Sequence, residues 1–224
     1  MDKLRICSFN VRGLAESKKR TTVFNFLKET RNDILYLQET HSCPKDETQW
    51  IKEWGGSIYY AHGGKSSKGV AIAIKKKTQH KIIDQIKDPN GRYILLHIII
   101  NEQNYILLNY YAPTKDKSKE QMEYFEQIIT LMCNYVEQPL ILAGDFNTCL
   151  NPKIDKIGGK TEKQSDYAKQ IINTIDELNL ADIWRVRNPD TLHFTRRQNT
   201  KYGMVHSRLD FFLLSLHLYN INIA

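Results

Sequence analysis

Polar residues whose side chains suit metal and phosphate chemistry stand at the ends of apolar, strand-like runs. Asn10 closes the first such run, and Glu39 follows the second, residues 34–38. The other members of this set are Tyr111, Asp145, Asn147 and Asp210. Hard divalent cations such as Mg²⁺ prefer carboxylate and amide oxygens and keep several waters, which this set can supply. The pattern therefore favours a metal-assisted site where several strand ends converge.

Each of these residues also has a plainer interpretation when it is taken alone. Asparagine at a strand end is commonly a turn former, and Glu39 by itself is typical of a solvated surface charge. The run Asp145-Phe146-Asn147 after Gly144 is compatible with a simple Asx turn. Polar residues at the ends of several apolar runs are hard to obtain together from turn chemistry alone, so the joint occurrence favours a functional site.

Residues 4–38 predict a βαβ unit that positions Asn10 and Glu39. Apolar runs at residues 4–9 and 34–38 are of strand length. Between them Val23, Phe26 and Leu27 recur at helical spacing in a segment rich in charges, which predicts an amphipathic helix that buries these three side chains. The order strand, helix, strand is typical of an α/β fold.

The middle of the chain predicts an antiparallel meander. A short helix at residues 47–53 is followed by strand-like runs separated by turn residues such as Gly63-Gly64 and Asn90-Gly91. The predicted strands are residues 57–61, 69–74, 81–86, 92–100 and 105–111.

The second half alternates helices with strands again. Helical patterns cover residues 119–136 and 165–178, and apolar strands are predicted at residues 140–143 and 209–214. No Pro/Gly/Ser-rich linker divides the chain. These elements predict one domain over residues 1–224, an α/β protein built as a four-layer α/β/β/α sandwich of two packed mixed sheets with outer helices.

Net charge, the length of apolar runs and the spacing of the cysteines further limit the classes of protein to which the chain can belong. Thirty-two Lys and Arg against 25 Asp and Glu leave a net charge of +7 over 224 residues, a modest preference for polyanionic partners. No apolar run is long enough for a membrane span, and no signal-peptide pattern opens the chain. The four cysteines are scattered without a C-x-x-C pair, so free thiols in a reducing compartment are expected.

Five motifs occur in a recognisable order, and together they resemble those of the endonuclease/exonuclease/phosphatase superfamily. More closely, the spellings are similar to the apurinic-type endonuclease domain of LINE-type non-LTR retrotransposons. The resemblance covers residues 4 to about 220. The motifs are residues 8–14 (SFNVRGL), 37–41 (LQETH), 109–113 (NYYAP), 144–147 (GDFN) and 207–210 (SRLD).

The resemblance implies a role for each matching residue. Glu39 would bind a catalytic Mg²⁺ or Mn²⁺, with Asn10 beside it orienting ligands or phosphate. Asp145 would deprotonate the attacking water, Asn147 would contact that water or a nonbridging oxygen, and Tyr111 would contact the scissile phosphate. Asp210 would orient a histidine. These roles meet the needs of in-line attack on a phosphodiester.

The sequence departs from the family pattern near its end. The family closes with a Ser/Thr-Asp-His signature on a last strand, and this chain reaches Ala224 without one. His217 is the sole histidine after Asp210, and it lacks the preceding aspartate and comes early. Because loss of a general acid/base costs about 10²–10⁴ in rate, weak or absent activity is expected, together with an incomplete sheet whose last strand is missing.

A basic segment before Asp210 predicts a DNA-binding hairpin. Residues 192–203 (LHFTRRQNTKYG) read as two short strands, with Arg196 and Arg197 placed near the tip. Arginines beside a phosphodiesterase site can bind phosphates or enter the minor groove. The family resemblance implies that Thr195 and Ser207 contact the substrate backbone.

The main hypothesis is a divalent-metal-dependent endonuclease that nicks double-stranded DNA, acts in the nucleus and is fused to a reverse transcriptase in a parent polyprotein. One alternative is a non-catalytic remnant that only binds nucleic acid. Another is a cellular abasic-site endonuclease of DNA repair, which the absence of an obvious lesion-binding aromatic loop makes less favourable.

Overall fold

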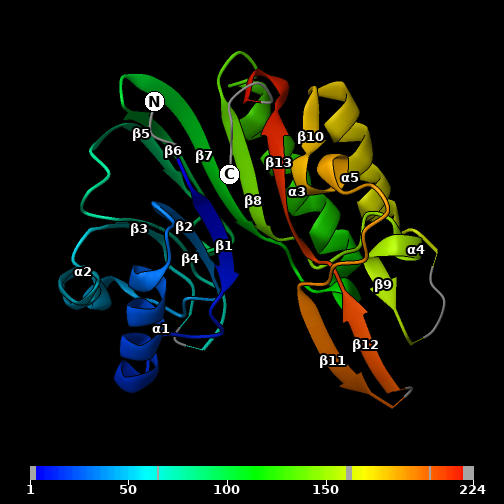
Figure 1. Cartoon of the computed structure of the whole chain (residues 1–224), viewed down its shortest axis with the longest axis horizontal. Coiled ribbons are helices and arrows are strands. Elements are labelled where there is room, and N and C mark those ends of the chain that lie inside the picture. The colour runs from blue at the N-terminus through cyan, green and yellow to red at the C-terminus, as the bar shows by residue number, and fades with distance from the viewer. Residues whose placement is uncertain (1–3, 65, 160–162, 202, 219–224) are drawn as a thin grey trace.

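The chain folds into two packed β-sheets with helices on both outer faces (Figure 1). The structure is a computed structural model that describes residues 4–64, 66–159, 163–201 and 203–218. The first sheet has the strand order β1-β2-β4-β3, and the second has the order β10-β13-β8-β7-β6-β5. The predicted four-layer α/β/β/α sandwich is confirmed.

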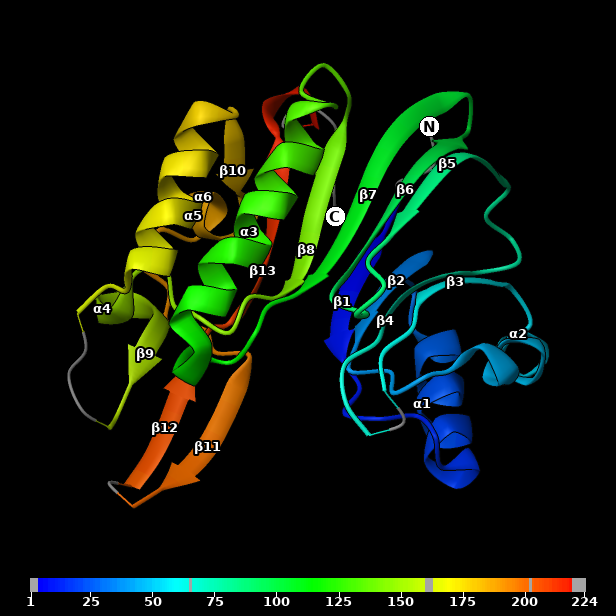
Figure 2. The same cartoon turned by 180° about the vertical axis from the view of Figure 1, so that it is seen from behind.

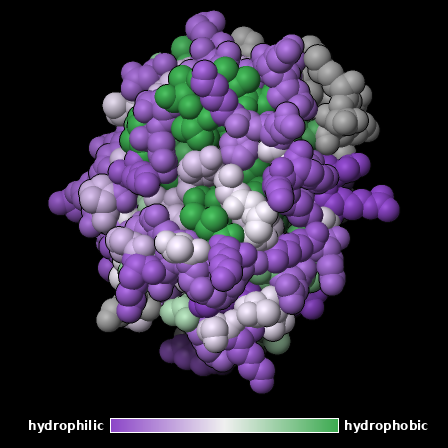
Figure 3. All heavy atoms as spheres, turned by 90° about the vertical axis from the view of Figure 1, so that its left-hand side faces the viewer, coloured by the Kyte–Doolittle hydropathy of each residue, from purple (hydrophilic) through white to green (hydrophobic). Residues whose placement is uncertain are grey.

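The first sheet combines one parallel and two antiparallel pairings. Its strands are β1 (Ile6–Asn10), β2 (Ile34–Gln38), β3 (Ser57–Ala61) and β4 (Val70–Ile74). β1 runs parallel to β2, while β2 and β3 both pair antiparallel with β4. Helices α1 (Ser17–Glu29) and α2 (Glu47–Trp54) cover its outer face. On that side of the molecule the surface is mainly hydrophilic (Figure 3).

The second sheet is larger, and helices α3 (Ser118–Cys133) and α5 (Asp166–Glu177) cover its outer face (Figure 2). Short elements precede or follow these helices and strands: η1 (Pro44–Asp46) precedes α2 of the first half, η2 (Lys115–Lys117) precedes α3, and α6 (Ile183–Arg187) follows β10. The strands of the second sheet are β5 (His80–Lys87), β6 (Tyr93–Ile100), β7 (Gln103–Tyr111), β8 (Leu140–Asp145), β10 (Leu180–Asp182) and β13 (Asp210–Ser215).

A third, three-stranded sheet projects from the second sheet (Figure 1). It consists of β9 (Lys156–Ile157) after the short helix α4 (Pro152–Asp155), and of the hairpin β11 (Arg196–Thr200) and β12 (Gly203–Ser207). β13 follows this hairpin directly and ends at η3 (Leu216–Leu218). The hairpin and the candidate residue Asp210 are therefore parts of one continuous segment.

The central layer between the sheets explains which side chains can meet at their edge. Alternate residues of β2, Ile34 and Tyr36, face the central core, and Leu35 and Leu37 face α1 and α2. In β8, Ile141 likewise belongs to the central core. Because side chains alternate along a strand, the same inward faces carry Gln38, Asp145 and the other polar strand-end residues toward the gap between the sheets.

Two sequence-based predictions about local structure were wrong. In α1 the exposed fraction of Phe26 is 56%, and Phe24 is buried instead, against Trp50 and Trp54. The predicted single meander is divided, since β3 and β4 belong to the first sheet and β5, β6 and β7 to the second. Hydrophobic spacing does not predict which sheet a strand joins, because strands of both sheets bury apolar side chains in the same central core.

None of the four cysteines forms a disulfide bond. Among the described residues no helix combines the length and the apolar character that a membrane crossing requires.

Candidate active site

Four of the predicted residues meet at one end of the two sheets and share hydrogen bonds. The amide nitrogen of Asn10 donates both to Glu39 Oε1, at 2.8 Å, and to Asp145 Oδ2, at 3.0 Å. The hydroxyl of Tyr111 donates to the same Glu39 oxygen at 3.0 Å. Residues separated by up to 135 positions in the chain thus form one cluster that joins the first sheet to the second.

Glu39 reaches this cluster because its backbone breaks the alternation of β2. Continued alternation would place Glu39 on the side of Leu35 and Leu37, beneath the helices. Its φ of +53° places it in the left-handed region, which costs a non-glycine residue about 1–3 kcal/mol. The turn brings the carboxylate toward Asn10 and Tyr111, and strain of this kind is typical of functional sites.

Asp145 and Asn147 are held by the tight connection that follows β8. The backbone N–H of Asn147 donates to Asp145 Oδ1 at 2.9 Å, and its side-chain amide donates to the carbonyl of Ala112 at 2.9 Å. Gly144 precedes them with φ +147°, and a Cβ at this position would lie 1.8 Å from the carbonyl oxygen of Tyr110. A glycine is therefore required for β7 and β8 to approach closely beside the site.

Asp210 lies directly opposite Asp145 in the antiparallel pairing of β13 with β8. Directly opposed residues point to the same face with Cβ atoms about 5 Å apart. Burial and the neighbouring charge of Asp145 raise the pKa of Asp210 to about 7, although Thr195 and the charges of Arg196 and Arg12 act in the opposite direction. Burial also raises the pKa of Asp145, against hydrogen bonds from Asn147 and Asn10. The site thus concentrates negative charge.

Tyr111 is supported by Arg92, a residue that the sequence analysis missed. The Arg92 guanidinium lies 5.1 Å from the centre of the Tyr111 ring and donates to the carbonyl of Ala112 at 3.2 Å. Burial, followed by the charge of Glu39, raises the pKa of the Tyr111 hydroxyl well above its usual value, so this group is a hydrogen-bond donor at neutral pH. Arg92 follows a turn in which Asp88 accepts its backbone N–H, and that turn was the available signal.

A second missed feature is a buried amide network between the sheets, directly under the cluster. The side-chain amide of Gln38 donates to Asn109 at 2.8 Å and to Ser8 at 3.0 Å. Asn109 in turn donates to the backbone carbonyls of Leu37 and Ala71. Gln38 and Asn109 are fully buried. A polar residue inside the otherwise apolar run of β7 was the sequence signal for this link.

The predicted hairpin forms, but the placement of its arginines near the tip was wrong. Arg196 and Arg197 begin β11, opposite Ser207 and His206, while the turn follows Thr200. Arg196 lies near the site, where its charge lowers the pKa of both Asp145 and Asp210. Because neighbouring residues of a strand point to opposite faces, Arg197 is directed away from the side on which Arg196 lies.

Thr195 and Ser207 both lie at the base of the hairpin. The hydroxyl oxygen of Thr195 accepts the backbone N–H groups of Leu209 and Asp210, at 3.0 and 3.2 Å. The carbonyl of Ser207 accepts the Thr195 N–H at 3.0 Å. Thr195 therefore fixes the start of β13, and with it the position of Asp210.

A buried ion network anchors the same segment from the other side. Arg208 donates to Asp155 at 2.8 Å and to Asp182 at 2.6 Å, and Arg185 also donates to Asp155 at 2.6 Å. Arg208 and Asp155 are almost fully buried. The network ties β12 and β13 to α4 and β10, so the hairpin base is rigidly connected to the second sheet.

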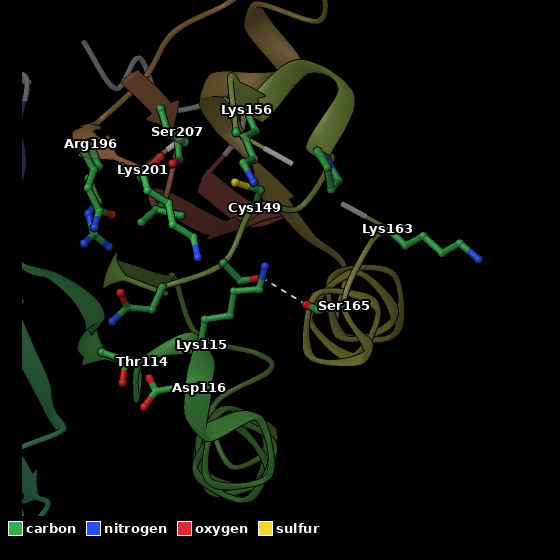
Figure 4. A pocket seen from close by; sticks show the side chains of 18 residues that line it. Thr114, Lys115, Asp116, Cys149, Lys156, Lys163, Ser165, Arg196, Lys201 and Ser207 are labelled. Atoms are coloured by element: carbon green, nitrogen blue, oxygen red, sulfur yellow. Dashed lines mark hydrogen bonds between the residues drawn. The ribbon is translucent and has the colours of Figure 1, made fainter. Parts of the chain in front are cut away.

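A cationic pocket of about 570 Å³ opens between the hairpin and η2 (Figure 4). In this view Lys201 and Lys115 extend into it from opposite sides, while Lys163 points away. Asn147, Arg196 and Ser207 line the pocket as well, so it adjoins the cluster around Asp145. Asp116 is the single acidic residue among the described residues that line it.

The backbone of His217 lies at the other end of β13 from Asp210. It lies in η3, which follows the far end of β13, whereas Asp210 begins this strand. Six residues of extended chain span about 20 Å. Within the residues described here, the main groups that act on the Asp210 carboxyl are Asp145, Thr195, Arg196 and Arg12, and none of them is a histidine.

The cluster has the donor chemistry of a magnesium or manganese site with few protein ligands. Glu39 Oε1 accepts two hydrogen bonds, while Oε2 faces His41 Nε2 at 3.9 Å and is left for a cation. Asn10 Oδ1 accepts the Arg12 N–H and has a second lone pair. No group of three acidic, histidine or cysteine side chains with metal-binding geometry occurs in the described part of the chain. An ion that retains most of its waters fits these residues.

Comparison with known proteins agrees with this architecture. The model of the Endonuclease/Exonuclease/phosphatase family matches residues 7–222. The chain is 28% identical over 216 residues to the Transposon TX1 uncharacterized 149 kDa protein of Xenopus laevis. The matched region covers 96% of this chain but 16% of that protein. It therefore spans about a sixth of that relative. It is also 23% identical to an exodeoxyribonuclease of Bacillus subtilis (strain 168), covering 95% of this chain and 88% of that protein.

Solved structures of low sequence identity share the fold. An AP endonuclease from Archaeoglobus fulgidus superposes with a TM-score of 0.70 at 22% identity, covering 96% of this chain and 88% of that one. The endonuclease domain of TRAS1, a telomere-specific non-LTR retrotransposon, gives a TM-score of 0.67 at 15% identity, with coverage of 97% and 88%. With the family model matching nearly its whole length, this chain belongs to the endonuclease/exonuclease/phosphatase family.

Proposed function

We propose that the chain is a divalent-metal-dependent endonuclease that hydrolyses phosphodiester bonds in double-stranded DNA. The observation that carries this proposal is the cluster in which Asn10 bridges Glu39 and Asp145 while Tyr111 donates to Glu39. A carboxylate for the metal, a carboxylate for the water and a phenol for phosphate are thereby placed side by side, as in-line attack on a diester requires.

Each side chain then has a defined task. Glu39 and Asn10 would hold Mg²⁺ or Mn²⁺, which would supply neutralisation of the charge that develops on the phosphoryl oxygens. Asp145 accepts the proton of the attacking water. The second N–H of the Asn147 amide and the hydroxyl of Tyr111 donate to nonbridging oxygens of the scissile phosphate.

The hairpin base and the adjoining cationic pocket bind the DNA. Arg196 and Ser207 line that pocket, and their location supports contacts with the DNA backbone close to the scissile bond. Thr195 acts mainly through Asp210, because its hydroxyl oxygen is engaged by the start of β13. Arg197, on the opposite face of β11, contributes charge to DNA attraction without contact at the scissile phosphate.

The similarity to a transposon protein and to a retrotransposon endonuclease domain supports a role in mobile-element integration. We infer that the chain acts in the nucleus as the nicking part of a larger protein with a reverse transcriptase. The 3′ hydroxyl left by nicking then primes synthesis on the element's RNA.

One observation favours a second candidate, a chain that binds nucleic acid without cutting it. None of the main groups that act on the Asp210 carboxyl in the described residues is a histidine. Without an imidazole in this position, phosphate stabilisation loses a contribution of about 10²–10⁴ in rate. The cationic pocket and the hairpin would still bind DNA.

A plasmid-nicking assay separates the two candidates. Supercoiled plasmid is incubated with the chain in Mg²⁺, in Mn²⁺ and in EDTA, next to Glu39→Ala and to Glu29→Ala, an exposed control on α1. The endonuclease proposal expects metal-dependent nicking that Glu39→Ala abolishes and Glu29→Ala preserves. Retained DNA binding without nicking by the unaltered chain supports the second candidate. Equal nicking by Glu39→Ala contradicts the assignment of the metal ligand.

A further inference from the structure

The segment that carries Glu39 is held in a strained backbone conformation. Both Glu39 and His41 have φ of +53°, on either side of the fully buried Thr40. Two non-glycine residues in the left-handed region cost about 1–3 kcal/mol each, and such conformations persist when surrounding contacts over-determine them. The contacts that hold this loop therefore decide whether Glu39 points into the cluster.

Backbone hydrogen bonds hold the loop from two sides. The N–H groups of Gly13 and Leu14 donate to the carbonyls of Glu39 and Thr40. On the other side the N–H of Thr40 donates to Gly69 at 2.9 Å, and the N–H of His41 donates to Lys68 at 3.0 Å. A Cβ at Gly69 would lie 2.5 Å from Thr40 Oγ1, so the two segments are in close contact.

Side chains extend this anchoring into a four-residue relay. Thr40 Oγ1 lies 3.0 Å from Ser42 Oγ, which lies 2.9 Å from His62 Nδ1. The opposite ring nitrogen, Nε2, lies 2.8 Å from Glu47 Oε1 on α2. The His62 ring also stacks on Tyr60, with centroids 5.2 Å apart and an interplanar angle of 17°.

The relay has the members of a nucleophilic triad but not its accessibility. Ser42 is fully buried, so no substrate can reach its hydroxyl. All contacts are satisfied when His62 carries its proton on Nε2 and donates it to Glu47, Ser42 donates to Nδ1, and Thr40 donates to Ser42. The hydrogen-bond directions then lead from the Glu39 loop to α2, which makes a positional anchor of the four residues.

We propose that His62 is a positioning residue for Glu39. Through Ser42 and Thr40 it stabilises the left-handed turn that directs Glu39 toward Asn10 and Tyr111. His62 itself does not touch the cluster. The inference rests on the proposed function in one respect, that Glu39 is the residue that binds the divalent cation.

Two substitutions at position 62 separate the halves of the relay. In His62→Asn the amide lies where Nδ1 was and keeps the bond with Ser42, whereas in His62→Gln it lies where Nε2 was and keeps the bond with Glu47. The two readouts are hydrogen exchange of the Thr40 and His41 amides in the full chain, and Mn²⁺ affinity by calorimetry. Neither readout requires turnover.

We expect His62→Gln to exchange both amides about tenfold faster, because local opening becomes easier. Its Mn²⁺ affinity should fall about tenfold, as is typical when a residue that orients a ligand is lost. His62→Asn should stay within about twofold of the unaltered chain in both readouts, and Ser42→Ala should reproduce the effect of His62→Gln. The melting temperature is measured alongside, and if His62→Gln does not fold, Ser42→Ala decides.

The inference is overturned if exchange at Thr40 and His41 is unchanged in Ser42→Ala or His62→Gln, or if His62→Asn is as impaired as His62→Gln. Failure of the proposed function looks different. In that case Glu39→Ala leaves Mn²⁺ affinity unchanged, while hydrogen exchange still reports whether His62 anchors the loop.

Discussion

Glu39 and Asp145 are bridged by the same amide of Asn10, but the chain holds the two carboxylates by different means. Asp145 ends a regular strand, opposite Asp210 in the register of β8 and β13. Glu39 lies beyond the end of β2 in a strained turn that backbone and side-chain contacts maintain. Sheet pairing positions Asp145 and Asp210, which together form the Asp145–Asp210 arm of the site. A loop positions Glu39, which forms the Glu39 arm.

The two arms are therefore sensitive to different structural changes. A register shift would move every side chain of β13 to the opposite face, so the Asp145–Asp210 arm changes only with the sheet itself. The Glu39 arm can open locally while the sheets stay intact, because loops belong to the least stable parts of a fold.

The largest loss of unfolding free energy is expected from Arg208→Met, which removes the buried cation beside the Asp145–Asp210 arm. Asp155 and Asp182 would remain buried without their main partner, and breaking a buried pair in this way costs about 3–5 kcal/mol. Urea unfolding measures the loss. Arg197→Met, at an exposed position of the same hairpin, should change the unfolding free energy by less than about 0.5 kcal/mol.

A smaller effect, which depends on pH, is expected from Asp210→Asn. The folded pKa of Asp210 is about 7, above the unfolded value of about 3.9, so the stability it contributes is full below pH 4 and is lost as the pH rises through 7. At pH 8 the variant should therefore be more stable than the unaltered chain, by about 2–4 kcal/mol.

Urea unfolding in EDTA at pH 4 and pH 8 tests this expectation. A stability difference between the two chains that is the same at both pH values would contradict the burial and charge repulsion assigned to Asp210. Glu177→Gln, an exposed substitution on α5, is the matched control.

On the opposite side of the molecule, Glu53→Gln should weaken the support of the Glu39 arm. Glu53 pairs with Arg20 at 2.6 Å, and Arg20 also donates to the carbonyl of Leu14 beside the Glu39 loop. Hydrogen bonds to Arg20 lower the pKa of Glu53 to about 2. We expect Glu53→Gln to lower the free energy of unfolding by about 1–2 kcal/mol at pH 7.

The sign of the pH dependence is opposite to that of Asp210. Since the folded pKa of Glu53 lies below the unfolded value, its contribution is present above about pH 4 and disappears as the pH falls toward 2. Thermal unfolding of both chains between pH 3 and pH 7 should show the gap closing on acidification. A gap that widens in acid would exclude the ion pair as its cause.

The smallest effect concerns DNA affinity. Arg196→Ala removes a cation that lines the pocket, so affinity for a DNA duplex should fall about tenfold at low salt. Arg197→Ala, on the opposite face, should reduce affinity less than about threefold. Fluorescence anisotropy at two salt concentrations measures both. Equal losses would mean that the hairpin acts through its net charge alone.

Several parts of the fold and site were predictable because local pattern decides them. Strand positions follow from apolar runs, and the polar residues at their ends mark the edge where β1, β2, β7 and β8 terminate. The burial of Phe24 instead of Phe26 was not predictable from spacing. Both sit on a helix with several apolar residues, and only the positions of Trp50 and Trp54 select which one is covered.

The candidate site shows the same division. Asn10, Glu39, Tyr111 and Asp145 could be chosen from the sequence, since each follows or ends a strand-like run. Arg92 could not, because its contact with Tyr111 depends on a turn that returns the chain to the end of β7. The location of Arg196 at the hairpin base could not be chosen either, since the turn position within residues 196–207 depends on the register of β11 with β12 and on the pairing of β12 with β9.

The order of strands and helices, the α/β class and the polar residues at the strand ends can be taken from the amino-acid sequence, since they depend on hydrophobic period and local turn chemistry. The packing of the two sheets settles which sheet each strand joins and how Glu39 turns toward Asn10. Both depend on contacts between residues far apart in the chain, such as Ser42 with His62 or Gln38 with Asn109, and these contacts exist only when the two sheets pack.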